Sequence, residues 1–246
     1  MKETLYAIPV NEAFAEASEC PLCALRARYE DGTLESLLAS AYMEPDCRIR
    51  TNAAGFCAEH SAMMFDRKNR LGMALMLDTH MQAVIADLEK LLAKPESGKH
   101  LPFLQKKTDE GTPARIRARI SRCALCEQID EMESHYLATI LHLFRNDTGF
   151  RAQFEGCKGF CIPHFADLLA AADKLSGKEK EAFIRTLSQI ELENLRRVEG
   201  DLSWFTQKFD YRNEDKPWGN SKDAVERAAN KLRSQCCGEA PLKKPQ

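Results

Sequence analysis

Eight cysteine and histidine side chains recur in two copies of one spacing pattern. CPLC at residues 20–23 and GFCAEH at 55–60 are followed by CALC at 123–126 and GFCIPH at 159–164. Adding 103 to the first CxxC gives the second, and adding 104 to the first GFCxxH gives its counterpart. Thiolates and neutral imidazoles are ligands for zinc and for other soft or borderline cations. The pattern therefore predicts metal sites in a chain made of two versions of one unit.

Within each copy, the two ligand pairs together make a Cys3His set, which is a standard tetrahedral zinc environment. Four protein ligands leave no open position for a substrate, so we expect two structural zinc ions. Two iron–sulfur clusters are the alternative, because thiolates with one histidine also hold such clusters and the spacing does not separate the two. We assign site 1 to Cys20, Cys23, Cys57 and His60, and site 2 to Cys123, Cys126, Cys161 and His164.

The local sequence places each ligand pair at the beginning of a helix. Proline is favoured in the first turn of a helix, so Pro21 makes Cys20 the cap of a helix whose next turn presents Cys23. Gly55 permits a tight turn ahead of Cys57 and His60. Free N–H groups and the positive end of the helix dipole favour thiolate over thiol at such positions.

The elements that carry these motifs are predicted to be helices. Apolar side chains recur at three- and four-residue steps over residues 77–92 and 183–205, and no convincing alternation of period two occurs. We expect an all-α helical bundle of two pseudo-symmetric repeats, each with its own Cys3His site, and methionines 63–81 as core filler. The expected parts are repeat 1 at 1–94, a linker at 95–113, repeat 2 at 114–210, and a C-terminal strap, short charged helix and frayed tail at 211–246.

Ten cysteines in a chain without the apolar core of a signal peptide suggest a cytoplasmic protein, in which metal ligation is favoured over disulfides. No apolar run is long enough to span a membrane. Four cysteines have no counterpart in the other repeat, and we interpret them as core thiols, spare ligands or incidental residues: Cys47, Cys157, Cys236 and Cys237.

The charge balance favours neither nucleic acid nor membrane as a partner. The chain has 35 basic and 37 acidic residues, and no aromatic residues interleave with the arginines of the basic stretch at 94–122. No common catalytic motif gives evidence for an enzyme. We expect a non-catalytic scaffold or adaptor with a protein partner. The alternatives are an iron–sulfur electron-transfer or cluster-sensing protein and a thiol-based redox or metal sensor.

The duplicated CxxC…GFCxxH motifs, followed by FTQKFDYRNEDKPWG at 205–219, resemble an uncharacterised bacterial family of unknown function. The resemblance covers nearly the whole chain, and it implies a cytosolic location and metal-ligand roles for the eight residues named above. It implies no activity. The aromatic segment ending at Trp218 is expected to be a strap that folds back on the bundle, with a docking surface as the alternative.

Overall fold

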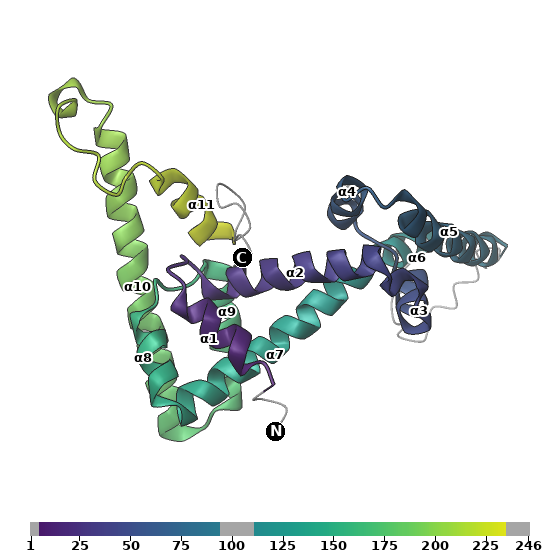
Figure 1. The fold of residues 1–246 in the computed structure, drawn as a ribbon, viewed down its shortest axis with the longest axis horizontal. Coiled ribbons are helices and arrows are strands. Elements are labelled where there is room, and N and C mark those ends of the chain that lie inside the picture. Colours follow the sequence, from purple (N-terminus) through teal and green to yellow (C-terminus); the bar gives the residue numbers. More distant parts are fainter. Residues whose placement is uncertain (1–4, 94–110, 235–246) are drawn as a thin grey trace, which may run out of the picture. The chain divides into compact units, whose positions relative to one another are not determined.

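The computed structural model describes residues 5–93 and 111–234, and these ranges contain eleven α-helices and no strand (Figure 1). The prediction of an all-α protein is therefore confirmed. The chain divides into two compact units, one formed by Met1–Tyr29 with Glu131–Gln246 and the other by Glu30–Asp130. Most of the expected linker at 95–113, and both Cys236 and Cys237, lie outside the described residues.

The two compact units do not coincide with the two sequence repeats. Helix α2 (Pro21–Ala39) begins in the first unit and ends in the second, and helix α7 (Ala124–Asn146) does the reverse. Each unit therefore contains segments from both repeats, and this arrangement determines which ligand pairs meet.

The first unit is built around the long helix α10, which packs against α8, α9 and α11, while α1 packs against α8. Aromatic rings fill its core in edge-to-face and stacked contacts, with centroids such as those of Phe144 and Phe183 5.0 Å apart. The hydrophobic face predicted for residues 183–205 is thus confirmed at Phe183, Leu187 and Val198, which are buried. Besides its parts of α2 and α7, this unit contains α1 (Ala7–Ala15), α8 (Thr148–Gly156), α9 (Ile162–Ala171), α10 (Gly177–Gln207) and α11 (Ala224–Arg233).

In the second unit, helix α5 packs against α3, α4 and α6, and methionines replace the aromatic rings in the core. Met64, Met73 and Met76 are buried as predicted, because the flexible thioether fills irregular gaps between helices. Met81 is 62% exposed, so the prediction was wrong for that residue. Besides its parts of α2 and α7, this unit contains α3 (Pro45–Ala54), α4 (Ala58–Asp66), α5 (Arg70–Leu92) and α6 (Thr112–Ile120).

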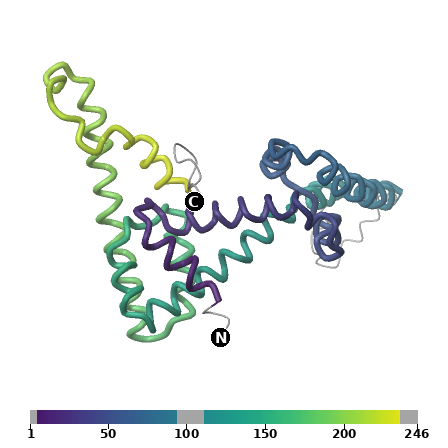
Figure 2. The backbone as a smooth tube through the Cα atoms, viewed as in Figure 1, coloured from purple at the N-terminus to yellow at the C-terminus, as the bar shows by residue number. Residues whose placement is uncertain are grey.

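The chain turns back at the end of α10 and returns as α11 (Figure 2). The turn is organised by Lys208, whose Nζ donates hydrogen bonds to the carbonyls of Asn213, Glu214 and Lys216 at 2.6–2.8 Å. The ring of Trp218 packs on Phe205, with centroids 5.8 Å apart. The segment expected to be a strap folds back on the end of its own helix, and Trp218 remains partly exposed there. No helix in the described ranges is both long and apolar enough to cross a bilayer.

Candidate metal centres

All four ligand pairs lie at helix N-termini, as the sequence predicted. Cys20 and Cys123 directly precede helices α2 and α7, and Cys57 and Cys161 are the N-cap residues of α4 and α9. The chain enters α4 and α9 through Gly55 and Gly159, whose φ angles are +66° and +78°. Glycine adopts this left-handed conformation without steric cost, which explains its place in both GFCxxH motifs.

The ligand pairs combine across the repeats, which corrects the predicted grouping. The CxxC of the first repeat meets the CxxH of the second, and the CxxC of the second meets the CxxH of the first. The predicted pairings of Cys20 with His60 and of Cys123 with His164 were therefore wrong. We name the two observed groups site A, which is Cys20, Cys23, Cys161 and His164, and site B, which is Cys57, His60, Cys123 and Cys126.

Helix lengths give the physical reason for this exchange. The 19 residues of α2 carry the chain about 28 Å away from the Cys20–Cys23 turn, at about 1.5 Å per residue. The 10 residues of α3 span only about 15 Å, so that helix alone does not bring Cys57 back to the start of α2. The partner that each CxxC meets is instead supplied by the other repeat.

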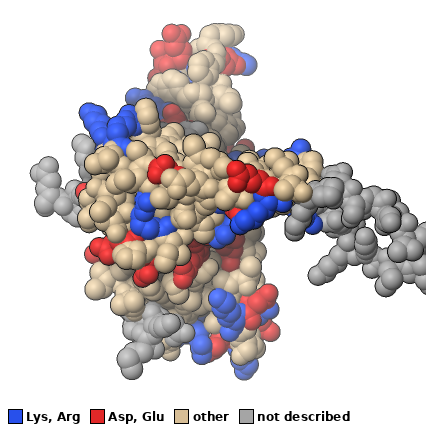
Figure 3. Space-filling view, turned by 90° about the vertical axis from the view of Figure 1, so that its right-hand side faces the viewer, with Lys and Arg blue, Asp and Glu red and all other residues tan. Residues whose placement is uncertain are grey.

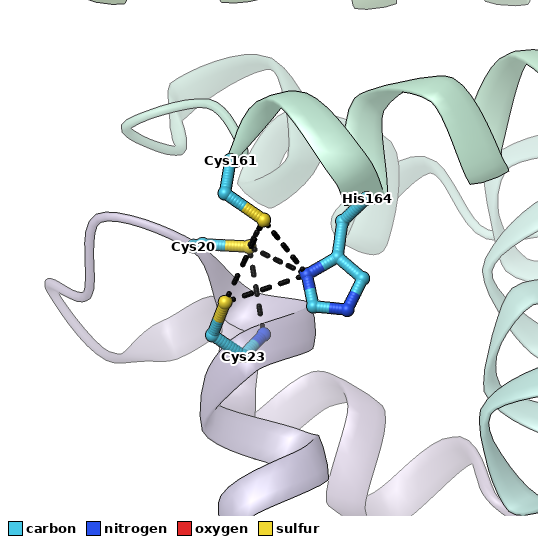
Figure 4. A group of neighbouring side chains, drawn as sticks. All are labelled: Cys20, Cys23, Cys161 and His164. Atoms are coloured by element: carbon cyan, nitrogen blue, oxygen red, sulfur yellow. Dashed lines mark hydrogen bonds between the residues drawn. The ribbon is translucent and has the colours of Figure 1, made fainter. Parts of the chain in front are cut away.

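In site A, the three sulfur atoms and His164 converge on one point from the start of α2 and the start of α9 (Figure 4). The Nδ1 atom of His164 lies 3.4 Å from the Sγ atoms of both Cys20 and Cys23 and 3.1 Å from that of Cys161. The Cys161 sulfur lies 3.9 Å from Cys20 and 3.7 Å from Cys23. All four residues are buried.

Site B repeats this geometry. The Nδ1 atom of His60 lies 3.2 Å from the Sγ atom of Cys57 and 3.4 Å from those of Cys123 and Cys126. The Cys57 and Cys126 sulfurs are 3.9 Å apart. His60 and Cys123 are buried, whereas Cys57 and Cys126 are partly exposed.

These distances fit four ligands around one ion. A tetrahedral zinc with Zn–S of about 2.3 Å and Zn–N of about 2.0–2.1 Å holds its sulfurs about 3.8 Å apart, and sulfur and nitrogen about 3.6 Å apart. In each site the four ligand atoms lie within 4.8 Å of one another. The ligands of a four-iron cluster bind different iron atoms and stand around the whole cluster, so they need a wider opening. Each group can therefore hold a single metal ion.

A glutamate orients each histidine from the side opposite the sulfurs. The Nε2 atom of His164 lies 3.0 Å from Oε1 of Glu133, and Nε2 of His60 lies 2.9 Å from Oε1 of Glu30. Such a carboxylate fixes the tautomer that leaves Nδ1 free to bind a metal. The repeat offset of 103 relates Glu30 to Glu133, so the signal for this pair was present in the sequence, but it did not reveal their role.

The electrostatics of site A favour one thiolate beside a charged imidazole when no metal is bound. Hydrogen bonds from the thiols of Cys20 and Cys23, and one from His164, hold the pKa of Cys161 far below its usual range. Burial disfavours the charged ring of His164, yet its bonds to Cys161, Cys23 and Glu133 raise its pKa to about 12. Burial raises the pKa of Cys20 well above its ordinary value.

Site B follows the same pattern. Hydrogen bonds with Cys123 and Glu30 raise the pKa of His60 to about 10. Burial raises the pKa of Cys123, but the hydrogen bond from His60 and backbone N–H groups outweigh it and lower the pKa to about 6. Burial raises the pKa of Cys126 to about 12. A metal ion would therefore replace protons on one imidazole and on at least one thiol in each site.

The two remaining described cysteines lie outside both groups. Cys47 is buried in the core of the second unit, and Cys157 packs against the core of the first. Their interpretation as core thiols agrees with these positions. A third cluster, formed by Glu133, His164 and the exposed Asp167, shares His164 with site A and extends it.

Comparison with known proteins adds the family. No curated protein and no solved structure matches the chain. The model of a family of unknown function, DUF6062, matches residues 1–239, a range that includes all eight ligand residues and the strap. This protein belongs to the DUF6062 family of unknown function.

Proposed function

We propose that this protein is a zinc-binding, non-catalytic scaffold or adaptor, in which each Cys3His site holds one structural zinc ion. The proposal rests on one observation: the ligand atoms of each site lie within 4.8 Å of one another, as four ligands of one ion do. A Cys3His set fills all four tetrahedral positions, so the ion has no open position for a substrate. This arrangement supports a structural role rather than a catalytic one.

The charge of such a site also suits its position. Three thiolates and one neutral imidazole around a divalent ion carry a net charge of −1. The ligand pairs of site A begin helices α2 and α9, and those of site B begin α7 and α4, so each ion faces the positive ends of two helix dipoles. These helix ends stabilise the bound thiolates.

Each ion would connect segments that are distant in the chain. The Cys20–Cys161 contact spans 141 residues and the Cys57–Cys126 contact spans 69 residues. Structural zinc contributes about 10–16 kcal/mol of apparent binding free energy in small finger peptides. Whole domains are stable by only about 5–15 kcal/mol. Metal binding and folding are therefore expected to be linked in both units.

Metal analysis of anaerobically purified protein tests the proposal. We expect a colourless protein with two zinc ions per chain, and loss of the cooperative thermal transition in far-UV circular dichroism after chelation. A brown protein that absorbs near ~400 nm would support the iron–sulfur alternative instead. An unchanged transition after complete metal removal would contradict a structural role.

We further propose a cytoplasmic location and a protein partner. The six ligand cysteines support the location, because a reducing compartment keeps them free of disulfides and available to bind metal.

A protein partner is favoured over nucleic acid, because basic and acidic side chains are interspersed on the face of the molecule shown in Figure 3. On the strap, Phe209 and Tyr211 are 74% and 83% exposed. A partner retained by the wild type but lost by a Phe209→Ala/Tyr211→Ala variant with normal zinc content would support the adaptor role, and equal retention by both would contradict binding through the strap.

A further inference from the structure

We propose that the two metal sites differ in permanence: site A keeps its ion because helix α11 closes it, whereas site B exchanges its ion with competing thiol or chelating ligands. This inference rests on the proposed function, since it assumes that both sites bind metal. Site B is then the site whose occupancy changes when the supply of metal falls or when a competing ligand attacks.

Equivalent ligands of the two sites differ in their exposure. In site A, Cys23 is 9% exposed and Cys161 is 1% exposed. Their counterparts in site B, Cys126 and Cys57, are both partly exposed. An incoming ligand must reach the metal or a bound sulfur, and the shell around a site controls that access. Site B is therefore the less enclosed of the two sites, at Cys57 and Cys126.

The GFC turn that leads into each CxxH is packed differently in the two sites. Phe160, which precedes Cys161, is fully buried and contacts the rings of Phe14 and Phe154. Phe56, the equivalent residue before Cys57, is only partly buried against the methionine-rich core. Local opening occurs most readily where few apolar contacts are lost, so the turn of site B is the one that opens more easily.

The C-terminal end of α11 contacts site A. The hydroxyl of Ser234, directly after this helix, lies 3.3 Å from the Sγ atom of Cys161. A hydroxyl that donates to a metal-bound thiolate stabilises its charge and occupies one direction of approach. The helix itself packs against α9, which carries Cys161 and His164 at its start, and against α10.

Lys231 on α11 joins the two ligand segments of site A. Its side chain is buried, and its Nζ donates to the carbonyls of Glu19 at 2.5 Å and Lys158 at 2.6 Å. Glu19 immediately precedes Cys20, and Lys158 lies three residues before Cys161. One ammonium group thus holds both halves of the site in place, and separating them would cost this buried charge at least one of its hydrogen bonds.

Site B connects its two ligand segments in a different way. The backbone N–H of Ala124 donates to the carbonyl of Gly55 at 2.9 Å. The residue equivalent to Ala124 in the other repeat is Pro21, which has no N–H to donate. The two sites are therefore closed by different means: site A by a buried side chain from α11, and site B by a backbone hydrogen bond beside two partly exposed cysteines.

Zinc release from the two-zinc protein into excess chelator, followed with a colorimetric indicator, tests this inference. We expect two phases of one equivalent each. Cys126→Ser is expected to remove the fast phase, and Cys161→Ser the slow phase. Alkylation with N-ethylmaleimide, mapped by peptide analysis, is expected to modify Cys57 and Cys126 before the other four ligand cysteines. A single phase for both ions, or a fast phase that is lost in Cys161→Ser, would overturn the inference.

Variants of α11 separate the closing role of that helix from a general loss of stability. Lys231→Met is expected to accelerate the slow phase by about tenfold or more, in line with the loss of an outer-shell contact, and to leave the fast phase unchanged. Ser234→Ala removes only the hydroxyl and should accelerate the same phase without unfolding the protein. Arg233→Ala, at an exposed position of the same helix, is the matched control. Unchanged release from both the Lys231 and Ser234 variants would contradict closure by α11.

The result also separates this inference from the proposed function. Protein that binds fewer than two metal ions per chain, or an iron–sulfur cluster, contradicts the proposed function. Two zinc ions that leave at the same rate contradict only the difference between the sites.

Discussion

The Sγ atoms of Cys20 and Cys161 are 3.9 Å apart although 141 residues separate the two cysteines in the chain. Cys57 and Cys126 show the same relationship across 69 residues. Each metal site therefore takes its CxxC from one repeat and its CxxH from the other. The two repeats thus exchange ligand pairs, and neither repeat completes a Cys3His group from its own residues.

Paired cysteine variants test this exchange. Cys20→Ser/Cys161→Ser removes two ligands from site A and leaves site B complete, so we expect it to retain one zinc ion after dialysis against a weak chelator. Cys20→Ser/Cys57→Ser removes one ligand from each site and is expected to retain less metal. Native mass spectrometry of both variants measures the difference. The opposite order of zinc retention would support grouping within each repeat and contradict the structure.

The sequence was sufficient to identify the ligands and their helix N-termini but not to match them. Motif spacing identifies a CxxC and a CxxH, and with two copies of each it is equally compatible with both pairings. The lengths of the intervening helices decide between them, because α2 begins at Pro21 within its CxxC and runs for 19 residues before the chain can turn. Helix boundaries are the least certain part of a sequence-based prediction, so this information was not accessible from the pattern alone.

Removal of the carboxylate behind each histidine should weaken metal binding. Glu133 and Glu30 fix the rings of His164 and His60 through bonds of 3.0 and 2.9 Å. Glu133→Ala and Glu30→Ala are each expected to lower zinc affinity at one site by about 10- to 100-fold, as other outer-shell substitutions do. Competition with a chelator of known affinity measures the change. Glu131→Ala, at an exposed position on the same helix as Glu133, should bind zinc like the wild type, and an equal loss in that variant would contradict the assignment.

The contribution of α11 was also beyond the sequence pattern. A short charged helix was predicted within residues 211–246, and the structure has a helix at Ala224–Arg233. Charged side chains on a short helix are usually exposed, yet Arg227 and Lys231 are buried. Lys231 is accommodated because carbonyls more than 70 residues away accept its hydrogen bonds, and nothing in the local sequence reports such distant partners.

Alanine at either turn glycine should destabilise the protein. At Gly159, with φ of +78°, a Cβ would lie 3.0 Å from Oε2 of Glu191 and 3.3 Å from Cβ of Asn194. At Gly55 a Cβ would lie 2.3 Å from the ring of His80, which is itself held by a 2.8 Å contact with the carbonyl of Asn52. We expect Gly159→Ala to lower the free energy of unfolding by about 1–3 kcal/mol, and Gly55→Ala by at least as much.

A third glycine provides the control for these two variants. Gly200 lies within helix α10, and a Cβ there would meet nothing within 4 Å. Gly200→Ala should therefore stabilise the protein by about 0.5–1 kcal/mol, because alanine loses less backbone entropy in a helix. Urea unfolding of the zinc-loaded variants measures all three values. A Gly159→Ala variant as stable as the wild type would show that this turn does not need its left-handed conformation.

Zinc affinity should rise with pH, most clearly at site B. In the folded site without metal, the pKa values of about 10 for His60 and about 12 for Cys126 keep both residues protonated over about two pH units around pH 7.5. Zinc binds the neutral imidazole and the thiolate, so both protons must leave, one from Nδ1 and one from Sγ. Loss of at least these two protons makes the apparent affinity rise by about a hundredfold or more per pH unit. Below about pH 6, Cys123 becomes protonated as well, and this further proton makes the dependence steeper. Calorimetric titration in buffers with different ionisation enthalpies counts the protons released. Release of fewer than two protons per site B ion at pH 7.5 would contradict a metal-free site that holds an imidazolium beside a neutral thiol.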